Sequence, residues 1–334
     1  MMAALDPWLP PIFLGLMGLA MLVYVCLDGY DLGVGMLMSR ADAAQRDRMV
    51  ASIGPFWDAN ETWLVLGVGL LLVAFPRAHG VVLTALYGPV AVMLLALILR
   101  GVAFDFRVKA RDRHQAMWNR AFIGGSTVAA MAQGWMLGRY VGGLQEGWLF
   151  TLFAAAIAAA LPAAYLLLGA CWLVLKTEGT LQRRAQHWAR RAWPLVVGGI
   201  AAISLFTPWV SPTVAHRWFR LPEFAWLLPI PLASAAALLV LRRVLASDRV
   251  LEDRWCWLPL VLAMAVCALG FAGLAYSVWP FVVIDRLTMW QAANGTPALE
   301  FLLVGVLVTV PAIAGYTVFA YRVFGGKASA LTYG

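Results

Sequence analysis

Nine apolar stretches, each long enough to cross a lipid bilayer as a helix, recur along this sequence. A hydrocarbon core about 30 Å thick requires about 20 apolar residues in helical conformation. The chain is 63% hydrophobic and only 13% charged, whereas soluble domains carry about 25% charged residues. We therefore predict an all-α integral membrane protein with nine transmembrane helices. Their predicted limits are residues 10–38, 58–75, 80–106, 120–140, 148–175, 192–210, 224–245, 256–279 and 298–323.

The positive charges alternate between connecting segments and predict an orientation. Nineteen of the 25 Lys and Arg residues lie in the connections after odd-numbered spans or in the C-terminal tail. The opposite connections carry only Arg77, Arg217, Arg220 and Arg286. Because cytoplasmic loops are enriched in Lys and Arg, we expect the N-terminus outside and the C-terminus in the cytoplasm. The same loops explain the net charge of +8, and no basic segment interleaved with aromatics suggests a nucleic-acid partner.

The segments between the predicted spans are short, so residues 1–334 are predicted to be a single membrane domain. The first stretch has no basic leader and no clear cleavage site, so we expect a retained helix and not a signal peptide. Residues 41–54 have apolar side chains at helical spacing and are predicted to be a short surface helix. The Pro-rich stretch 208–231 is predicted to be a periplasmic loop that runs into the next helix. Glycines of the GYDLGVG run (29–35) are expected to permit close helix packing, because the strand context of a dinucleotide-binding motif is missing.

Six ionisable side chains lie inside or at the edge of the first three predicted spans. They are Asp28, Asp31, Asp58, Glu61, Arg100 and Asp105. In the predicted orientation, each pair lies in the cytoplasmic half of its helix, so all six converge at a similar depth. A charged side chain at the bilayer centre costs about 2.5–3.5 kcal/mol on insertion scales, and such residues usually mark a pathway or a site.

Five acids beside one buried arginine are the composition expected of a proton relay. A bidentate pair of Arg100 with Asp58 would hold that acid ionised. Burial and like charges favour the protonated form of the other carboxyl groups, which can then exchange protons. The alternative is structural: Asp58 or Asn60 would cap the second span, and Asp105 would pair with Arg107 at the membrane surface.

The residue types that bind redox cofactors are poorly placed in this sequence. A membrane haem needs axial ligands at depth, commonly His or Met. All four histidines fall in predicted loops or at interfaces: His79, His114, His187 and His216. The four cysteines form no CxxC pair and are expected to be inert apolar side chains. We therefore expect the chain to bind no redox metal by itself.

Several sequence blocks resemble subunit II of the cytochrome bd-type quinol oxidases. They are LDGYDLGVGML (27–37), GPFWDANETWLV (54–65), AFP (74–76), LRGVAFDFR (99–107), LTMWQA (287–292) and YRVFGGK (321–327). WDAN at 57–60, followed by Glu61, is more similar to the cyanide-insensitive branch of that family.

The resemblance implies two four-helix bundles plus one peripheral helix, paired pseudosymmetrically with a homologous subunit I in the bacterial inner membrane. Subunit I would hold haems b and d and would oxidise quinol and reduce oxygen to water. A small single-helix accessory subunit would be a further partner. Subunit II would stabilise subunit I and supply a cytoplasmic proton path to which Asp58 and Arg100 correspond. A structural quinone or lipid would contact Trp57.

Two other functions fit parts of the pattern. A proton-coupled secondary transporter would also need buried acids, but these usually lie near the midplane at broken helices in both halves of the chain. Here the acids lie in three consecutive helices and toward one face. A purely structural membrane subunit would tolerate Asp→Asn substitutions throughout.

Overall fold

The computed structural model describes residues 6–110 and 112–328, and nearly all of them are helical. The long helices are α1 (Leu9–Leu37), α3 (Trp57–Ala74), α4 (Pro76–Lys109), α5 (Asp112–Val141), α6 (Trp148–Lys176), α7 (Gly179–Val210), α10 (Pro229–Ala246), α11 (Leu258–Val278) and α13 (Thr296–Val323). The short helices are α2 (Ala43–Ile53), α8 (Pro212–Phe219), α9 (Glu223–Leu227) and α12 (Met289–Ala292). Single 3-10 turns are η2 (Asp6–Trp8), η3 (Met38–Arg40) and η4 (Asp248–Leu251), and β1 (Phe281–Val283) pairs antiparallel with β2 (Leu287–Thr288).

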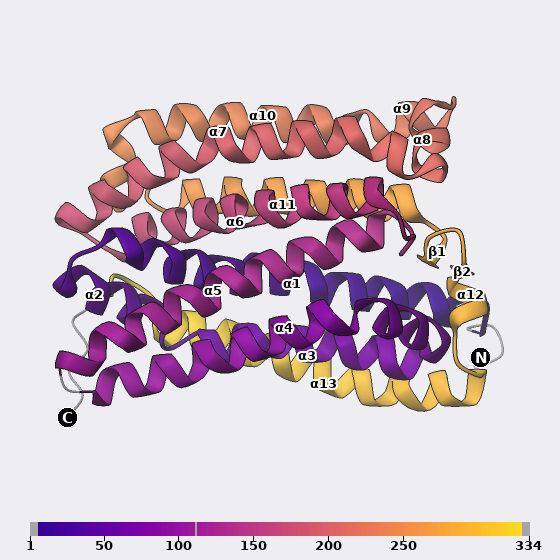
Figure 1. Ribbon diagram of the computed structural model, residues 1–334, viewed down its shortest axis with the longest axis horizontal. Coiled ribbons are helices and arrows are strands. Elements are labelled where there is room, and N and C mark those ends of the chain that lie inside the picture. The colour runs from indigo at the N-terminus through magenta and orange to yellow at the C-terminus, as the bar shows by residue number, and fades with distance from the viewer. Residues whose placement is uncertain (1–5, 111, 329–334) are drawn as a thin grey trace.

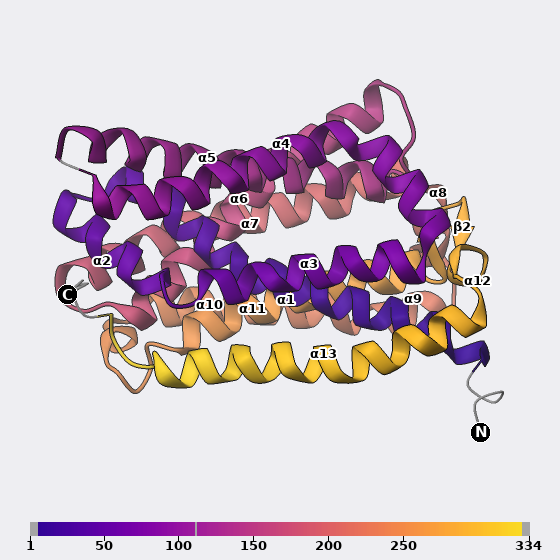
Figure 2. The same cartoon turned by 90° about the horizontal axis from the view of Figure 1, so that it is seen from below.

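The long helices run along the longest axis of the molecule, side by side (Figure 1). α7 and α10 lie on one side, α3, α4 and α13 on the opposite side, and α1, α5, α6 and α11 between them (Figures 1 and 2). α1 begins at the end of the molecule that carries α8, α9 and α12, which we call the α12 end. It finishes at the end that carries α2, which we call the α2 end (Figure 1).

Within the described residues, seven helices are each long and apolar enough to cross a membrane: α1, α4, α6, α7, α10 with α9, α11 and α13. The pair α2 and α3, bent by 51° at its break, passes the same test together and makes an eighth. α5 has the length of a span, at 30 residues, but carries more polar side chains and is not among them.

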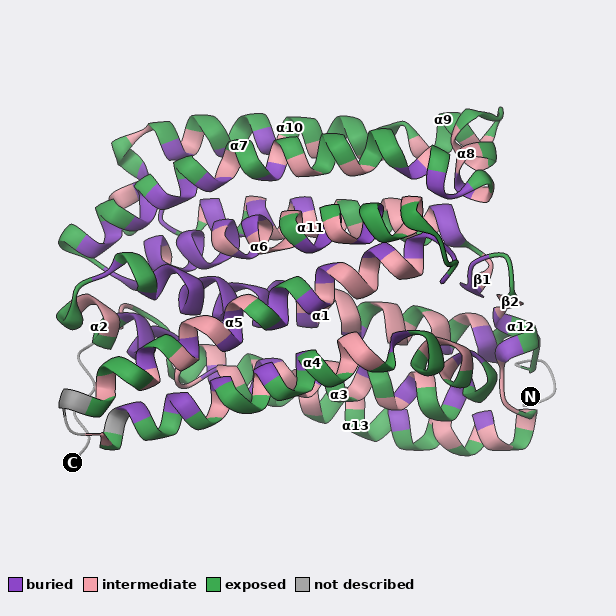
Figure 3. Cartoon of the chain, viewed as in Figure 1, coloured by how far each residue is buried: buried purple, intermediate pink, exposed green. Residues whose placement is uncertain are grey.

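The tightest helix crossing lies between α1 and α6. A Cβ atom on Gly33 would lie 1.8 Å from the backbone oxygen of Tyr165, and one on Gly169 would lie 2.5 Å from the backbone of Gly33. A Cβ atom on Gly35 would lie 2.3 Å from the Ser126 Oγ atom on α5. The prediction that the GYDLGVG run permits close packing is thus confirmed. Buried residues gather in this region, in the second half of α1 and in α6, whereas α10 and α13 are mostly exposed (Figure 3).

The predicted helices all exist, but several begin earlier than the apolar runs suggested. α7 starts at Gly179 and not at residue 192, because its first turns are amphipathic and bury Leu181, Ala185 and Trp188. α5 likewise starts at Asp112. The predicted helix at 41–54 is α2, whose Met49, Val50 and Ile53 face the core and whose first turn is capped by Asp42.

The prediction of a loop at 208–231 was wrong. α7 continues to Val210, and α8 and α9 occupy most of the remainder. The prolines explain the pattern, because Pro212 and Pro229 each stand at the first position of a helix, where a missing N–H costs nothing. These two prolines therefore mark the starts of helices, and the Pro-rich segment is mostly helical.

Candidate functional site

Arg100 is the centre of a buried ionic cluster that joins three helices. Its Nη1 atom, on α4, donates to Asp28 Oδ1 on α1 at 2.9 Å and to Glu61 Oε1 on α3 at 2.8 Å. The Arg100 and Asp28 side chains are 1% and 0% exposed, and that of Glu61 is 29% exposed. Because a buried charge is tolerated only when it is paired and hydrogen-bonded, this arginine holds the two acids in place.

Several polar atoms of this cluster have no protein partner. Asp28 Oδ2, Asp31 Oδ1, and Arg100 Nε and Nη2 are all buried and make no hydrogen bond within the described residues. Buried polar atoms almost always have a partner, and in proteins this is often an internal water. The cluster therefore has both free acceptors and free donors with which water or a proton can interact.

Asp31 is held by a second group of side chains that continues to the last helix. Asn60 Nδ2, on α3, donates to Asp31 Oδ2 at 2.7 Å and to the Tyr30 hydroxyl at 2.8 Å. Tyr321, on α13, donates its hydroxyl to Asn60 Oδ1 at 3.1 Å and also contacts the Tyr30 hydroxyl. The Tyr30 ring stacks on Trp172 of α6 with centroids 4.1 Å apart. These contacts fix the orientation of the Asn60 amide and, through it, of Asp31.

A third polar chain lies beside Asp28. Tyr165, on α6, donates to Gln133 Oε1 on α5 at 2.6 Å, and Gln133 Nε2 donates to the Tyr24 hydroxyl on α1 at 2.8 Å. Both tyrosines lie within the electrostatic field of the Asp28 carboxylate. Hydrogen-bonding side chains of α1, α5 and α6 thus line the side of the cluster that α3 and α4 leave open.

Asp58 and Asp105 do not enter the buried cluster. Both side chains are exposed, and the charges of Asp105 and Arg100 act on Asp58. The prediction that Arg100 pairs with Asp58 was wrong, because Arg100 forms its ion pairs with Asp28 and Glu61. α3 follows α2 at an angle of 51°, and in its first turns Glu61 contacts Arg100 whereas Asp58 is exposed.

The structural alternatives for these two acids are not observed either. α3 has no side-chain cap, since its N-cap residue is Phe56. Arg107 donates to Asn119 Oδ1 at 2.6 Å and to Asp47 Oδ1 at 2.5 Å, and no ion pair with Asp105 is present among the described residues. Arg107 therefore ties α4 to α5 and α2.

Trp57 lies at the edge of the ionic cluster. Its ring is 6.0 Å from the Arg100 guanidinium and 5.3 Å from the ring of Phe104. The side chain is half-buried, so one part of the ring packs on the cluster and another part remains accessible.

Sequence reasoning missed the residues that orient Asp31. Asn60 stands in the WDAN block but carries no charge, and Tyr30 and Tyr321 look like ordinary aromatic residues of apolar helices. A polar amide inside an apolar run was a usable signal for Asn60, because such a group needs a partner in the membrane. Nothing local in the sequence connects Tyr321 with residues some 260 positions earlier.

No metal site accompanies this cluster. Within residues 6–110 and 112–328, no three His, Cys, Asp or Glu side chains lie together in a way that could hold a metal ion. His79 lies in the first turn of α4, His114 at the start of α5, and His216 in α8.

Comparison with known families gives a match over nearly the whole chain. A family model described as cytochrome bd terminal oxidase subunit II matches residues 9–324. Two relatives are subunits 2 of bd-type oxidases. The cytochrome bd ubiquinol oxidase subunit 2 of Bacillus subtilis is 27% identical over 91% of this chain and 92% of its own length. The cytochrome bd-I ubiquinol oxidase subunit 2 of Escherichia coli is 27% identical over 93% of both chains.

A solved structure shares the fold. The bd oxidase from Geobacillus thermodenitrificans contains a chain that superposes with a TM-score of 0.77, covering 96% of this chain and 99% of that one. The sequence identity in this comparison is 17%, so the similarity shows only that the two chains arrange their helices in the same way.

Proposed function

This chain belongs to the cytochrome bd terminal oxidase subunit II family, and we propose that it carries protons through the buried Arg100 cluster toward the partner subunit of a quinol oxidase complex. Membership makes the chain a membrane subunit of a bd-type quinol oxidase that works together with a subunit I and with haem cofactors. The observation that carries the proton assignment is a buried set of acids, Asp28, Asp31 and Glu61, around one shared guanidinium.

Protons would enter at Asp58 and Asp105. Both acids are exposed at the same end of α3 and α4, and Asp58 stands one helical turn before Glu61. The partly exposed Glu61 connects this surface to Arg100. A proton that arrives there would be passed to the unpartnered oxygens of Asp28 and Asp31, Asp28 Oδ2 and Asp31 Oδ1, directly or through water.

Arg100 and Asn60 position the acids of this path. Arg100 shares one nitrogen between Asp28 and Glu61, so protonation of either acid leaves the other paired with the guanidinium. Asn60 occupies one oxygen of Asp31 and leaves the other available. A relay needs acids that both take up and release protons. The guanidinium favours the ionised form of Asp28 and Glu61, whereas burial and the neighbouring carboxyl groups favour the protonated form, so the two effects oppose each other.

Haems b and d would reside in subunit I, where quinol is oxidised and oxygen is reduced. The haems supply the electron transfer to oxygen, and this chain's acids supply protons for that reaction. The peripheral placement of the histidines in this chain supports the assignment. A structural quinone or lipid would contact the accessible part of the Trp57 ring, and a small single-helix accessory subunit would complete the complex.

We further propose that the chain is one membrane domain, residues 1–334, with nine transmembrane helices. They would form two four-helix bundles and one peripheral helix, with α5 counted as a span because it lies among helices that qualify. The Lys and Arg distribution supports a periplasmic N-terminus and a cytoplasmic C-terminus in the bacterial inner membrane. In that orientation, Asp58 and Asp105 face the cytoplasm.

The test is an Asp58→Asn substitution in the intact complex. We expect slower proton uptake and lower oxidase turnover, because the first acid of the path loses its proton-binding group, while the haem spectrum stays unchanged. Glu178→Gln is the matched control, since Glu178 is an exposed acid between α6 and α7 that makes no ion pair within the described residues. Parental proton uptake in Asp58→Asn would remove Asp58 from the path, and parental uptake in Asp28→Asn as well would reduce the cluster to a structural role.

A further inference from the structure

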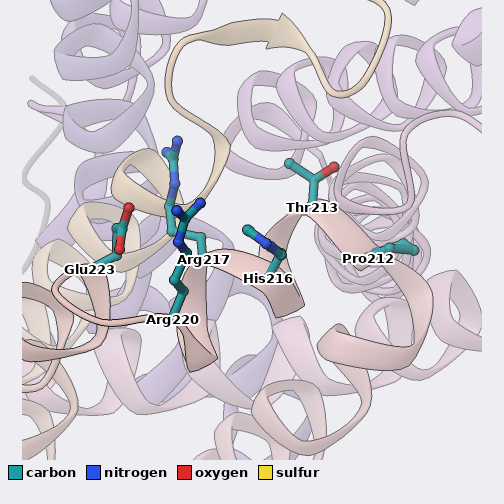
Figure 4. Close-up of a pocket in the computed structure, with 6 residues that line it drawn as sticks. All are labelled: Pro212, Thr213, His216, Arg217, Arg220 and Glu223. Carbon is teal, nitrogen blue, oxygen red and sulfur yellow. The ribbon is translucent and has the colours of Figure 1, made fainter.

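An open pocket lies at the α12 end of the molecule, opposite the Arg100 cluster. It has a volume of about 460 Å³ and is lined by residues of α8 and α9 and the turn between them, namely Pro212, Thr213, His216, Arg217, Arg220 and Glu223 (Figure 4). A neighbouring pocket of about 440 Å³ shares Arg217 and Glu223 and is otherwise lined by Ala275, Tyr276 and Trp279. A polar compartment thus adjoins an apolar one.

Two arginines dominate the polar compartment. Arg217 donates from Nη1 to the carbonyl oxygens of Tyr276, at 2.8 Å, and of Trp279, so this guanidinium is held against the end of α11. Its other nitrogens make no hydrogen bond to any of the described residues. Arg220 has neither an ion pair nor a side-chain hydrogen bond to any other described residue. Figure 4 shows the two side chains projecting in the same direction, with Glu223 on one side and His216 on the other.

The pocket has a net positive charge, which one anionic group would balance. With His216 neutral, two arginines and Glu223 leave a formal charge of +1, and no acid lies within ion-pair distance of either arginine among the described residues. Glu223 Oε2 is buried and has no hydrogen-bond partner there. A phosphodiester would balance the arginines, and a hydroxyl or ammonium group attached to it would supply the donor that Glu223 lacks.

The surroundings are those of a membrane surface. Phe219 on α8 and Trp226 on α9 are each 74% exposed, and Leu221, in the turn between these helices, is 73% exposed. Trp279, exposed at the end of α11, borders the apolar compartment. Exposed aromatic and apolar side chains at the end of a membrane helix are typical of the level where lipid headgroups meet acyl chains.

We propose that this pocket binds one glycerophospholipid, with its phosphodiester between Arg217 and Arg220 and the start of an acyl chain along Tyr276 and Trp279. Neither a free phosphate nor an uncharged lipid satisfies both compartments, since the first leaves the apolar groove empty and the second leaves the arginines unpaired. The site does not depend on the proton path, because it lies at the opposite end of the molecule.

Native mass spectrometry of the purified, delipidated complex, titrated with phosphatidylglycerol in mixed micelles, tests this site. Arg220→Gln should weaken the tightest lipid-binding event by about tenfold or more, as expected for the loss of a charge-assisted hydrogen bond. Arg77→Gln, which removes an exposed arginine of α4 at the same end of the molecule, should leave it unchanged. Arg220 is exposed, so its substitution does not threaten folding.

Two further probes separate the sources of the phosphate. Inorganic phosphate should not displace the lipid at equal concentration, and a diacylglycerol with the same chains should not bind in an Arg220-dependent manner. Equal lipid affinity in Arg220→Gln and the parent would overturn the site. Displacement by inorganic phosphate, or Arg220-dependent binding of diacylglycerol, would overturn the two-compartment assignment.

Discussion

Arg100 sets the chemistry of the cluster at the level of single residues. One guanidinium, 1% exposed, holds acids from two other helices, and two of its nitrogens have no protein partner. A planar cation with several donors can serve both acids at once, which a lysine cannot do with the same geometry. The arginine therefore has a structural role as well as an electrostatic one.

Replacing Arg100 should destabilise the subunit strongly. Arg100→Met leaves Asp28 buried without a counter-charge, and breaking such a pair costs about 3–5 kcal/mol. We expect a lower melting temperature of the complex and a reduced yield. Adding Asp28→Asn to Arg100→Met should restore part of the stability, because it removes the unpaired charge. If the melting temperature of Arg100→Met equals that of the parent, the pair does not hold the three helices together.

Tyr321 belongs to the group of side chains that orients Asp31 through Asn60. Tyr321→Phe removes the hydroxyl that donates to Asn60 and keeps the ring that packs 4.7 Å from Phe56. We expect a loss of about 0.5–1.5 kcal/mol in stability, the usual value of one hydrogen bond, together with proton uptake slowed severalfold in stopped-flow measurements. Tyr316→Phe, on the exposed face of the same helix, is the control. Identical uptake in the two variants would show that Tyr321 does not act on Asp31.

At the level of elements, the crossing of α1 and α6 places the cluster. Gly33 lies two residues after Asp31, and its backbone approaches that of Tyr165 too closely for any side chain. The same crossing brings Tyr165 beside Asp28 and Trp172 onto Tyr30. Small residues at a helix interface thus decide which polar side chains of α1 and α6 meet.

Gly33→Ala should therefore disrupt assembly. The added methyl group meets backbone and not a flexible side chain, so the helices must move apart, at a cost of about 2–3 kcal/mol or more. Gly15→Ala on the same helix is the matched control, because nothing lies within 4 Å of the Cβ position there. The melting temperature and the yield of assembled complex are the measurements. A Gly33→Ala complex as stable as the Gly15→Ala complex would mean that α1 and α6 can separate freely.

At the level of the whole molecule, charge separates the two ends. The α2 end carries the acids of the proposed proton entrance and most of the Lys and Arg residues, whereas the α12 end carries the arginine pocket of α8 and α9. One end would take protons from water, and the other would hold lipid. Each end faces its assigned side of the membrane only if the chain crosses the membrane the predicted number of times.

Cysteine labelling tests this topology. Single substitutions Lys109→Cys and Gln145→Cys stand on either side of α5, and both positions are exposed. If α5 crosses the membrane, an impermeant maleimide should label Gln145→Cys from outside and Lys109→Cys only after the membrane is permeabilised. The four native cysteines are buried or half-buried and provide the background. Labelling of both from one side would leave α5 outside the set of spans.

The amino-acid sequence alone predicted the helical class, the approximate positions of the long helices, the close packing at the GYDLGVG run and the convergence of the acids near one end of three helices. These follow from hydropathy, from glycine spacing and from chain direction, all of which are local or additive along the chain. The family resemblance also came from contiguous blocks, and the match to residues 9–324 confirms it.

The choice of the acids that pair with Arg100 and of those that face water depends on tertiary contacts between helices. Asp58 and Glu61 are one helical turn apart, so the depth and rotation of α3 decide which of them reaches Arg100, and in the structure it is Glu61. The Tyr321 contact with Asn60 and the α8–α9 pocket also required distant segments to meet. Pairing inside a membrane depends on the rotation and depth of each helix, which packing at sites such as Gly33 sets and which no local pattern encodes.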